Sequence, residues 1–119
     1  MEPDVFDPNC GSREVLDLIA DKWSALILYA LRGRTLRHAE LRRAIGGISQ
    51  KMLTQTLRTL ESDGIVRRVA FPVVPPHVEY SLTALGESLS PLLTEVCRWA
   101  ENNLADVQAA RVNAHGTSS

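Results

Sequence analysis

The chain has 119 residues, which suits one small domain with a single hydrophobic core. Hydrophobic residues make up 45% of it and charged residues 23%, as in ordinary globular proteins, and no apolar run is long enough to span a membrane. The acidic N-terminus lacks the basic and then apolar order of a signal peptide, and two cysteines, Cys10 and Cys97, are too few for a disulfide scaffold. We therefore expect a cytoplasmic protein that does not bind membranes.

The net charge of −1 conceals an uneven distribution along the chain. Residues 32–68 carry nine basic side chains against three acidic ones, a balance of +6, whereas residues 1–31 and 69–119 have balances of −4 and −3. A basic segment of this kind is the footprint expected for contacts with nucleic-acid phosphates. The alternative is a solvated charged face.

The first third of the chain predicts an arm followed by two helices. Residues 1–9 contain two prolines and three acids and are expected to form a flexible arm. Apolar spacing predicts a short helix over Ser12–Ile19, and the nearly continuous apolar run Trp23–Leu31 predicts the central buried helix. Gly33 follows as a helix end, and Thr35-Leu36 has the length of a one-bridge strand.

Residues 37–64 predict two helices joined by a short turn that contains glycine. The first helix is expected over Arg37–Ile45 and the second over Ser49–Gly64, with Ser49 as N-cap and Gly64 as the helix end. On the second helix, leucines 53, 57 and 60 form an apolar stripe opposite polar side chains that can hydrogen-bond phosphates and base edges. This is the pattern of a DNA-reading helix-turn-helix, although an ordinary amphipathic surface helix would share it.

After Gly64 the pattern changes to one typical of strands. Val66–Val74 is rich in β-branched residues, two prolines follow, and in His77–Leu82 apolar and polar residues alternate. Two strands around a proline-containing tip form a hairpin, and a helix-turn-helix followed by a hairpin is a winged helix. The expected fold class is therefore mainly α with a small β-hairpin (α+β), a winged helix-turn-helix with N- and C-terminal dimerisation helices.

A long final helix is expected from the Thr83 cap to about Ala110. It carries two adjacent apolar seams, Leu85/Leu89/Leu92/Val96/Trp99 and Leu93/Cys97/Ala100/Leu104/Val107. If one seam packs on the central helix, the other is free for a second subunit, which favours a homodimer over burial of both seams within one chain. The expected dimer interface comprises Val15, Leu16, Ile19, Leu93, Cys97, Ala100 and Leu104. The domain would then span residues 10–110, with a disordered tail at 111–119.

Several segments together resemble the HxlR-type family of bacterial winged-helix regulators. Their order and spacing carry the resemblance, which covers about residues 10–102, and the wing segment is its most specific part. The segments are Asp21–Leu28 (DKWSALIL), Glu40–Arg43 (ELRR), Gly47–Ser49 (GIS), Leu57–Val66 with its Leu60-Glu61 and Asp63-Gly64-Ile65-Val66, and Val74–Thr83 (VPPHVEYSLT) followed by Gly86.

The resemblance implies a homodimeric transcriptional regulator that binds inverted-repeat operators. Its recognition helix would enter the major groove, its wing would reach the adjacent minor groove or backbone, and its terminal helices would build the dimer. Family members often have a cysteine before the first helix, through which some sense oxidants or electrophiles, and Cys10 occupies that position. The chain departs from the family at His38, where Phe is frequent, and at His77, where a wing arginine is common. The first change is expected to loosen core packing, and the second to weaken the wing's DNA contact at neutral pH.

Roles on DNA follow from side-chain chemistry. Base readout is expected from the start of the second helix, where amide, ammonium and methyl groups match base edges. Arginines outside that helix are better suited to phosphates, while Ser49 would serve first as cap and then as phosphate donor. The expected base readers are Gln50, Lys51, Thr54 and Gln55; Arg58 would reach a base or a phosphate; Arg37, Arg42, Arg43, Arg67 and Arg68 would bind phosphates; and His77 would contact DNA from the wing.

Cys10 is the one candidate redox switch. Helix dipole and expected exposure favour its thiolate, whereas Asp4, Asp7 and Glu14 favour an inert thiol, so an unreactive N-terminal cysteine is the alternative. Cys97 lies in an apolar seam and is expected to be a small buried hydrophobe.

Other classes of function find little support. The three histidines are scattered without the carboxylate or thiol spacing of a catalytic set or metal site, so we expect no enzyme, no metal and no cofactor. The expected partners are double-stranded DNA and a second copy of the chain, with a small-molecule or oxidant effector left open. A protein-interaction winged helix, or a ligand-responsive regulator without redox sensing, is the alternative.

Overall fold

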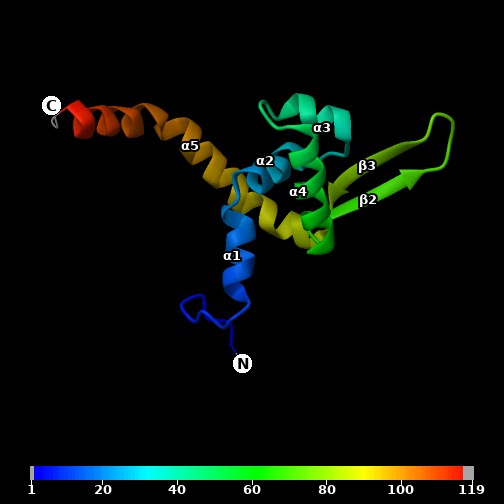
Figure 1. Cartoon of the computed structure of the whole chain (residues 1–119), viewed down its shortest axis with the longest axis horizontal. Coiled ribbons are helices and arrows are strands. Elements are labelled where there is room, and N and C mark those ends of the chain that lie inside the picture. The colour runs from blue at the N-terminus through cyan, green and yellow to red at the C-terminus, as the bar shows by residue number, and fades with distance from the viewer. Residues whose placement is uncertain (1, 117–119) are drawn as a thin grey trace.

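Five helices and a small sheet make up residues 2–116, the part of the chain that this computed structural model describes (Figure 1). The winged helix-turn-helix expected from the sequence is confirmed. In chain order the elements are α1 (Ser12–Ala20), α2 (Lys22–Leu31), β1 (Leu36–Arg37), α3 (His38–Ala44), α4 (Gln50–Ser62), β2 (Val66–Phe71), β3 (His77–Leu82) and α5 (Ala84–Gly116).

Local hydrogen bonds fix where the inner helices begin and end. The Asp21 carboxylate accepts from the backbone N–H groups of Trp23 and Ser24, at 2.8 and 3.1 Å, and so separates α2 from α1. Ser49 caps α4 as expected, since its hydroxyl accepts from the N–H of Met52 at 3.0 Å. Gly64, at φ +76°, ends α4, and the next N–H, of Ile65, donates back to the Leu60 carbonyl at 2.9 Å.

The sheet has the strand order β1-β3-β2, and both strand pairs are antiparallel. β2 and β3 form the wing, with a register that runs from Val66 opposite Leu82 to Phe71 opposite His77. β1 adds Leu36 opposite Tyr80 and Arg37 opposite Glu79. The short β1 therefore ties the base of the wing to the start of α3.

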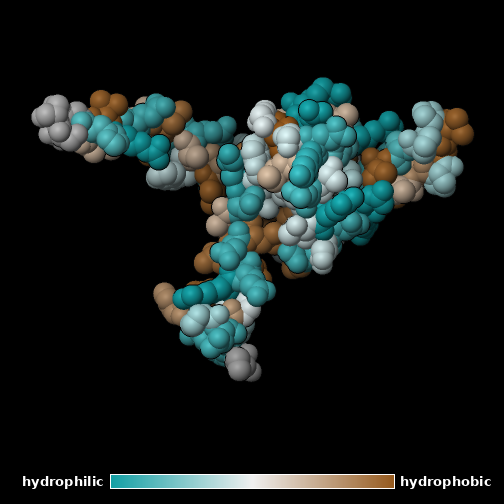
Figure 2. Space-filling view, in the orientation of Figure 1, coloured by the Kyte–Doolittle hydropathy of each residue, from teal (hydrophilic) through white to brown (hydrophobic). Residues whose placement is uncertain are grey.

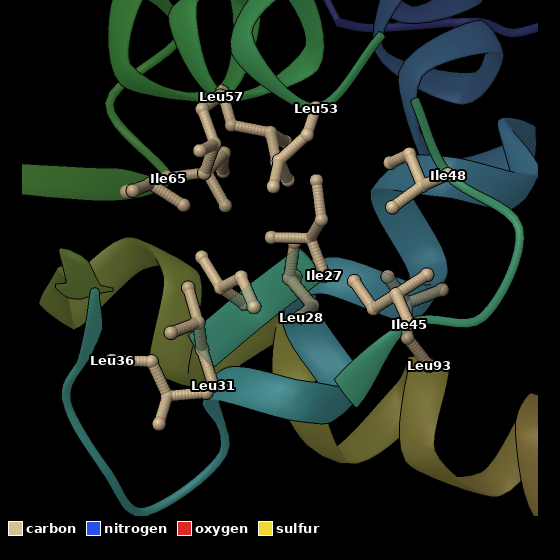
Figure 3. Packing of buried hydrophobic residues seen from close by; sticks show 13 residues of the cluster. Ile27, Leu28, Leu31, Leu36, Ile45, Ile48, Leu53, Leu57, Ile65 and Leu93 are labelled. Carbon is tan, nitrogen blue, oxygen red and sulfur yellow. The ribbon is translucent and has the colours of Figure 1, made fainter. Parts of the chain in front are cut away.

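The core lies where α2 meets α3, α4, the base of the wing and α5. Figure 3 shows side chains from these elements converging around Ile27 and Leu28, which are fully buried. The apolar stripe predicted for α4 is part of this core, because Leu53, Leu57 and Leu60 are at most 2% exposed. The opposite face of α4 is left to solvent.

α5 is longer than the sequence suggested. It continues through 33 residues to Gly116, so the expectation of a disordered tail from residue 111 is wrong for residues 111–116; residues 117–119 lie outside the described part. Figure 1 shows its C-terminal part projecting away from the body, while α1 projects in another direction. The Cα radius of gyration, 17.5 Å, exceeds the roughly 14 Å of a compact domain of this length.

The two seams of α5 are unequally buried. Leu93 is 2% exposed and packs into the core of its own chain. The prediction that it lies in the dimer interface is therefore wrong. The other seam is open over Leu92, Val96 and Trp99, which are exposed by 64, 58 and 61%, whereas its member Leu89 is partly buried against the core. The heptad spacing could not distinguish the seams, because both repeat at the same interval.

The remaining members of the expected interface are divided between buried and open positions. Val15 and Leu16 on α1 are exposed by 56 and 49%, and Leu104 on α5 by 53%. Ala100 is also exposed, whereas Cys97 and Ile19 are partly buried. Open apolar side chains thus lie on both terminal helices.

The N-terminal arm folds back through turns. The Arg13 guanidinium donates to the backbone carbonyls of Val5 and Phe6, at 2.8 and 3.1 Å. Asp7 N–H bonds the Asp4 carbonyl and Cys10 N–H bonds the Asp7 carbonyl. These bonds give the arm a defined path before α1, although the Phe6 ring is 86% exposed.

None of the helices within residues 2–116 is long and apolar enough to cross a membrane.

Candidate nucleic-acid interface

The outer face of α4 is the centre of the candidate interface. Its buried leucines point into the core, which leaves Lys51, Gln55 and Arg58 exposed and Thr54 partly buried at the edge nearest α3. The Ser49 cap satisfies one backbone donor of the first turn and so fixes where the helix starts. Side chains of the first turns are thereby held at defined positions on a rigid element.

A basic hollow of about 480 Å³ separates α3 from the start of α4. Arg42 and Arg43 of α3 lie on one side and Gln50 on the other, with His38 and Ala39 completing the lining. Glu40 does not neutralise these arginines at their own end of α3, because its carboxylate accepts from the Arg37 N–H at 2.8 Å at the beginning of the helix. The hollow can accept an anion such as a backbone phosphate.

A second hollow, of about 340 Å³, lies between α4 and the wing. Arg58 from α4 and Arg68 from β2 line it together with Thr54 and Tyr80, and Glu61 is its acidic member. The fold thus brings together side chains separated by ten residues in sequence. Arg67, next to Arg68 on the exposed part of β2, points to the opposite face of the strand.

An acidic hollow marks the other edge of this surface. It lies between α1 and α4, and Gln55 lines it beside the carboxylates of Glu14, Asp17 and Asp63. Since carboxylates repel phosphates, Gln55 stands at the border between a basic and an acidic region. The basic side, over α3 and the wing, is the side suited to DNA.

His38 makes a contact that the sequence did not indicate. Its Nε2 lies 3.0 Å from Oγ1 of Thr54, which joins the start of α3 to the outer face of α4. Partial burial and the nearby Arg42 guanidinium lower the pKa of His38, so the neutral ring dominates at neutral pH. His38 was expected to loosen the core; instead it makes a polar contact where α3 meets α4.

The wing departs from the expected DNA contact. His77 Nε2 lies 3.1 Å from a Glu79 carboxylate oxygen, and its ring stacks on Phe71 with centroids 4.8 Å apart. The imidazole is therefore engaged within the wing. Residues 69–76 carry no charge, and Val74 at the tip is 98% exposed. Figure 2 shows hydrophobic residues at the wing tip and along α5.

Cys10 sits in a small hydrogen-bonded turn before α1. Its sulfur accepts from the Ser12 hydroxyl and from the Asp4 N–H, each at 3.2 Å. These bonds lower the pKa of the Cys10 thiol, chiefly through the Ser12 side chain. Asp4, which the sequence suggested would oppose the thiolate, thus also supports it through its backbone.

Cys97 has the opposite character. Burial, with a smaller contribution from Glu101, raises the pKa of its thiol. Both cysteines are free thiols. Among residues 2–116 no group of three or more His, Cys, Asp or Glu side chains is placed to hold a metal ion.

Comparison with known proteins decides the family. The model of the HxlR-like helix-turn-helix family matches residues 18–108. The chain belongs to the HxlR-like helix-turn-helix family. It is a transcriptional regulator of the helix-turn-helix type, and the family resemblance seen in the sequence is confirmed.

Individual relatives are similar to this chain over most of their length. The uncharacterized HTH-type transcriptional regulator YtfH of Escherichia coli (strain K12) is 53% identical over 92% of this chain and 87% of its own. The solved structure of YtfH from Salmonella typhimurium has a TM-score of 0.86 at 52% identity, covering 92% and 98% of the two chains. The redox regulator HypR in its reduced form has a TM-score of 0.74 at 40% identity, covering 82% and 97%.

Some functional contacts had a signal in the sequence and others had none. Asp21 directly before an apolar run is a recognisable capping pattern, whereas Glu40 three residues after Arg37 matches only the acidic half of a capping box. The pairing of His38 with Thr54 depends on how α3 and α4 are packed, and the donors to Cys10 depend on the turn of the arm. No spacing rule would have revealed these contacts.

Proposed function

We propose that this HxlR-like regulator is a cytoplasmic homodimer that binds an inverted-repeat operator in double-stranded DNA, with α4 reading the sequence. The observation that carries the proposal is the outer face of α4. It presents Lys51 and Arg58 to solvent between two hollows that also contain Arg42, Arg43 and Arg68. Charge over the hollows suits phosphates, and the polar face between them suits base edges.

The proposed roles follow the position of each side chain. Gln50, Lys51, Thr54 and Gln55 read bases, Arg58 reaches a base or phosphate, and Ser49 supplements its cap role with a phosphate contact. The DNA backbone is bound by exposed arginines, namely Arg37, Arg42, Arg43, Arg67 and Arg68. His77 contributes little to DNA binding because its ring is already bound to Glu79 and Phe71.

The homodimer is supported by the open apolar side chains of the terminal helices. Leu92, Val96 and Trp99 on α5 lie within one exposed seam, and Val15 and Leu16 add to the apolar surface from α1. Exposing so many large apolar groups is unfavourable for a monomer in water. A second copy of the chain is the occupant proposed for this surface, with Leu104 and Ala100 at the interface and Cys97 near it.

Selection from a random-sequence duplex library tests DNA reading. Wild type should enrich a defined sequence, and the Gln50→Ala/Gln55→Ala double variant should enrich a broader set because base contacts are lost. Arg43→Ala should retain the wild-type sequence while weakening binding to every duplex and flattening the salt dependence. Failure of the wild type to enrich any sequence would refute DNA reading and favour a protein-interaction module.

Redox control through Cys10 is the second proposal. It is supported by the two donors to its sulfur, by the lowered pKa of its thiol, and by the likeness to the redox regulator HypR. Treatment with diamide or a quinone should change the affinity of wild type for its selected duplex. An identical change in Cys10→Ser would refute Cys10 as the sensor and favour a ligand-responsive regulator.

A further inference from the structure

The contact between His38 and Thr54 links two elements with different tasks. His38 is the first residue of α3, and Thr54 lies on the face of α4 proposed to read bases. Nε2 and Oγ1 are 3.0 Å apart, a normal hydrogen-bond distance, and both side chains are partly buried. Thr54 also lines the hollow between α4 and the wing, so its side chain borders open space as well as His38.

The state of the imidazole determines what Thr54 can offer to DNA. A hydroxyl has one proton and two lone pairs, whereas Nε2 is either a donor or an acceptor. If Nε2 carries hydrogen, Thr54 accepts from it and its own proton is free to donate outward. If Nε2 is bare, Thr54 donates to it and presents only lone pairs outward.

These two states suit different bases. At the exocyclic position where the bases differ, an outward donor matches O6 of guanine or O4 of thymine, and an outward acceptor matches the amino groups of adenine or cytosine. We propose that His38 is a specificity-determining positioning residue, which fixes the Thr54 side chain and sets the direction of the hydrogen bond that Thr54 makes with a base. The inference rests on the proposed DNA-reading role of α4.

The charges around His38 influence the pH at which its imidazole is protonated. Desolvation, with a smaller contribution from Arg42, lowers the pKa of His38, so the ring is neutral near pH 7 and either tautomer is available there. Protonation at lower pH places hydrogen on Nε2, so Thr54 accepts from it and its own proton is always free to donate outward. Acidification should therefore shift the base preference at one position toward guanine or thymine.

The elements packed against α3 bring few other charges to this ring. From α4, Gln50 lines the same hollow and Arg58 lies beyond Thr54. On α3 itself the other charged groups are Arg43 and Glu40, whose carboxylate accepts from the Arg37 N–H. Lys51 and Glu61 lie on α4, Arg37 on β1, and Glu79, which is paired with His77, on β3. On α2 the Lys22 ammonium lies over the Trp23 ring. Tyr80 is the further titratable group of β3 that borders Thr54.

The experiment compares duplexes selected from a random-sequence library at about pH 5.5 and about pH 8. Wild type should change its preference at one base position by about fivefold, the value of one neutral hydrogen bond. His38→Gln can still bond Thr54 but does not titrate, so its preference should be the same at both pH values. His77→Gln is the matched control and should retain the wild-type shift.

Coupling between the two residues gives a readout that is independent of pH. Thr54→Val keeps the methyl group and replaces the hydroxyl with a second methyl, so it should abolish the part of the preference at that position that depends on the hydrogen bond. His38→Phe should weaken the base preference at the same position, and the double variant should have the same preference as Thr54→Val alone. Additive effects, or a pH shift that persists in His38→Gln, would overturn the inference. A wild type that enriches no sequence would instead refute the proposed function itself.

Discussion

The junction between the wing and α5 offers a sharp test of the packing. A Cβ on Gly86 would lie 2.1 Å from the Ile65 carbonyl oxygen, whereas real Cβ atoms essentially never come closer than 3.0 Å. In Gly86→Ala, α5 must therefore move from Ile65 by about 1 Å. The same carbonyl accepts from the Thr83 N–H and hydroxyl, both at 3.1 Å, so the displacement also strains two hydrogen bonds.

The expected cost is about 3 kcal/mol. Overpacking contributes about 2 kcal/mol, and weakened hydrogen bonds add about 1 kcal/mol. With an m-value of about 1.5 kcal/mol/M, the urea midpoint should fall by about 2 M. Circular dichroism at one fixed protein concentration measures this, because dimerisation would make the midpoint depend on concentration.

Gly46→Ala is the matched control for this measurement. A Cβ there meets nothing within 4 Å, and Gly46 is not among the glycines with positive φ. Its free energy of unfolding should stay within about 0.5 kcal/mol of wild type. If Gly86→Ala unfolded at the wild-type urea concentration, the close packing of α5 on Ile65 would be refuted.

Three further expectations concern single side chains. Cys10 should be alkylated by iodoacetamide faster than Cys97 at neutral pH, because hydrogen bonds lower the pKa of the first thiol and burial raises that of the second; equal rates in mass spectrometry would contradict this. Asp21→Ala should lose about 1 kcal/mol of stability in urea unfolding and Asp21→Asn much less, since Asn also caps helices; equal losses would exclude the capping role. His38 has a lower pKa folded than unfolded, so the unfolded chain binds its proton first and stability falls as pH drops below 6.5. His38→Gln should reduce that fall in urea titrations, and an unchanged pH profile would show that His38 does not contribute to it.

The sequence predicted those parts of the fold that depend on neighbours along the chain. The boundaries of α4 follow from Ser49 and Gly64, and the wing from the change to strand periodicity after Gly64. Each feature is a local preference that packing then reinforces. The HxlR-like family and the winged helix-turn-helix were accordingly predictable.

Features that depend on packing between elements were not predictable. Two seams with the same spacing ran along α5, and only the position of α2 distinguishes buried Leu93 from exposed Leu92. Polar composition suggested that the chain loses structure after residue 110, but α5 continues to Gly116. Composition is a weak guide here, because a helix already formed extends at little cost per residue.

In the candidate site, too, features that depend on neighbours along the chain were predictable and features that depend on packing were not. Exposure of the arginines and of Lys51 followed from helical and strand periodicity, as expected. His77 was expected to reach DNA, yet Glu79 and Phe71 hold its ring within the wing. The Glu79 contact joins two residues on one face of β3, whereas the Phe71 contact arises from the pairing of β2 with β3. Both depend on strand geometry rather than on residue type alone.

A footprint of the wild-type protein on its selected duplex tests the central proposal most directly. A two-fold dimer that reads DNA through α4 should protect two equivalent, symmetry-related half-sites whose centres are about 34 Å apart, roughly one helical turn. Hydroxyl-radical cleavage would resolve the two blocks. A single protected half-site without a symmetric partner would contradict the homodimeric reader, and uniform cleavage would contradict sequence recognition.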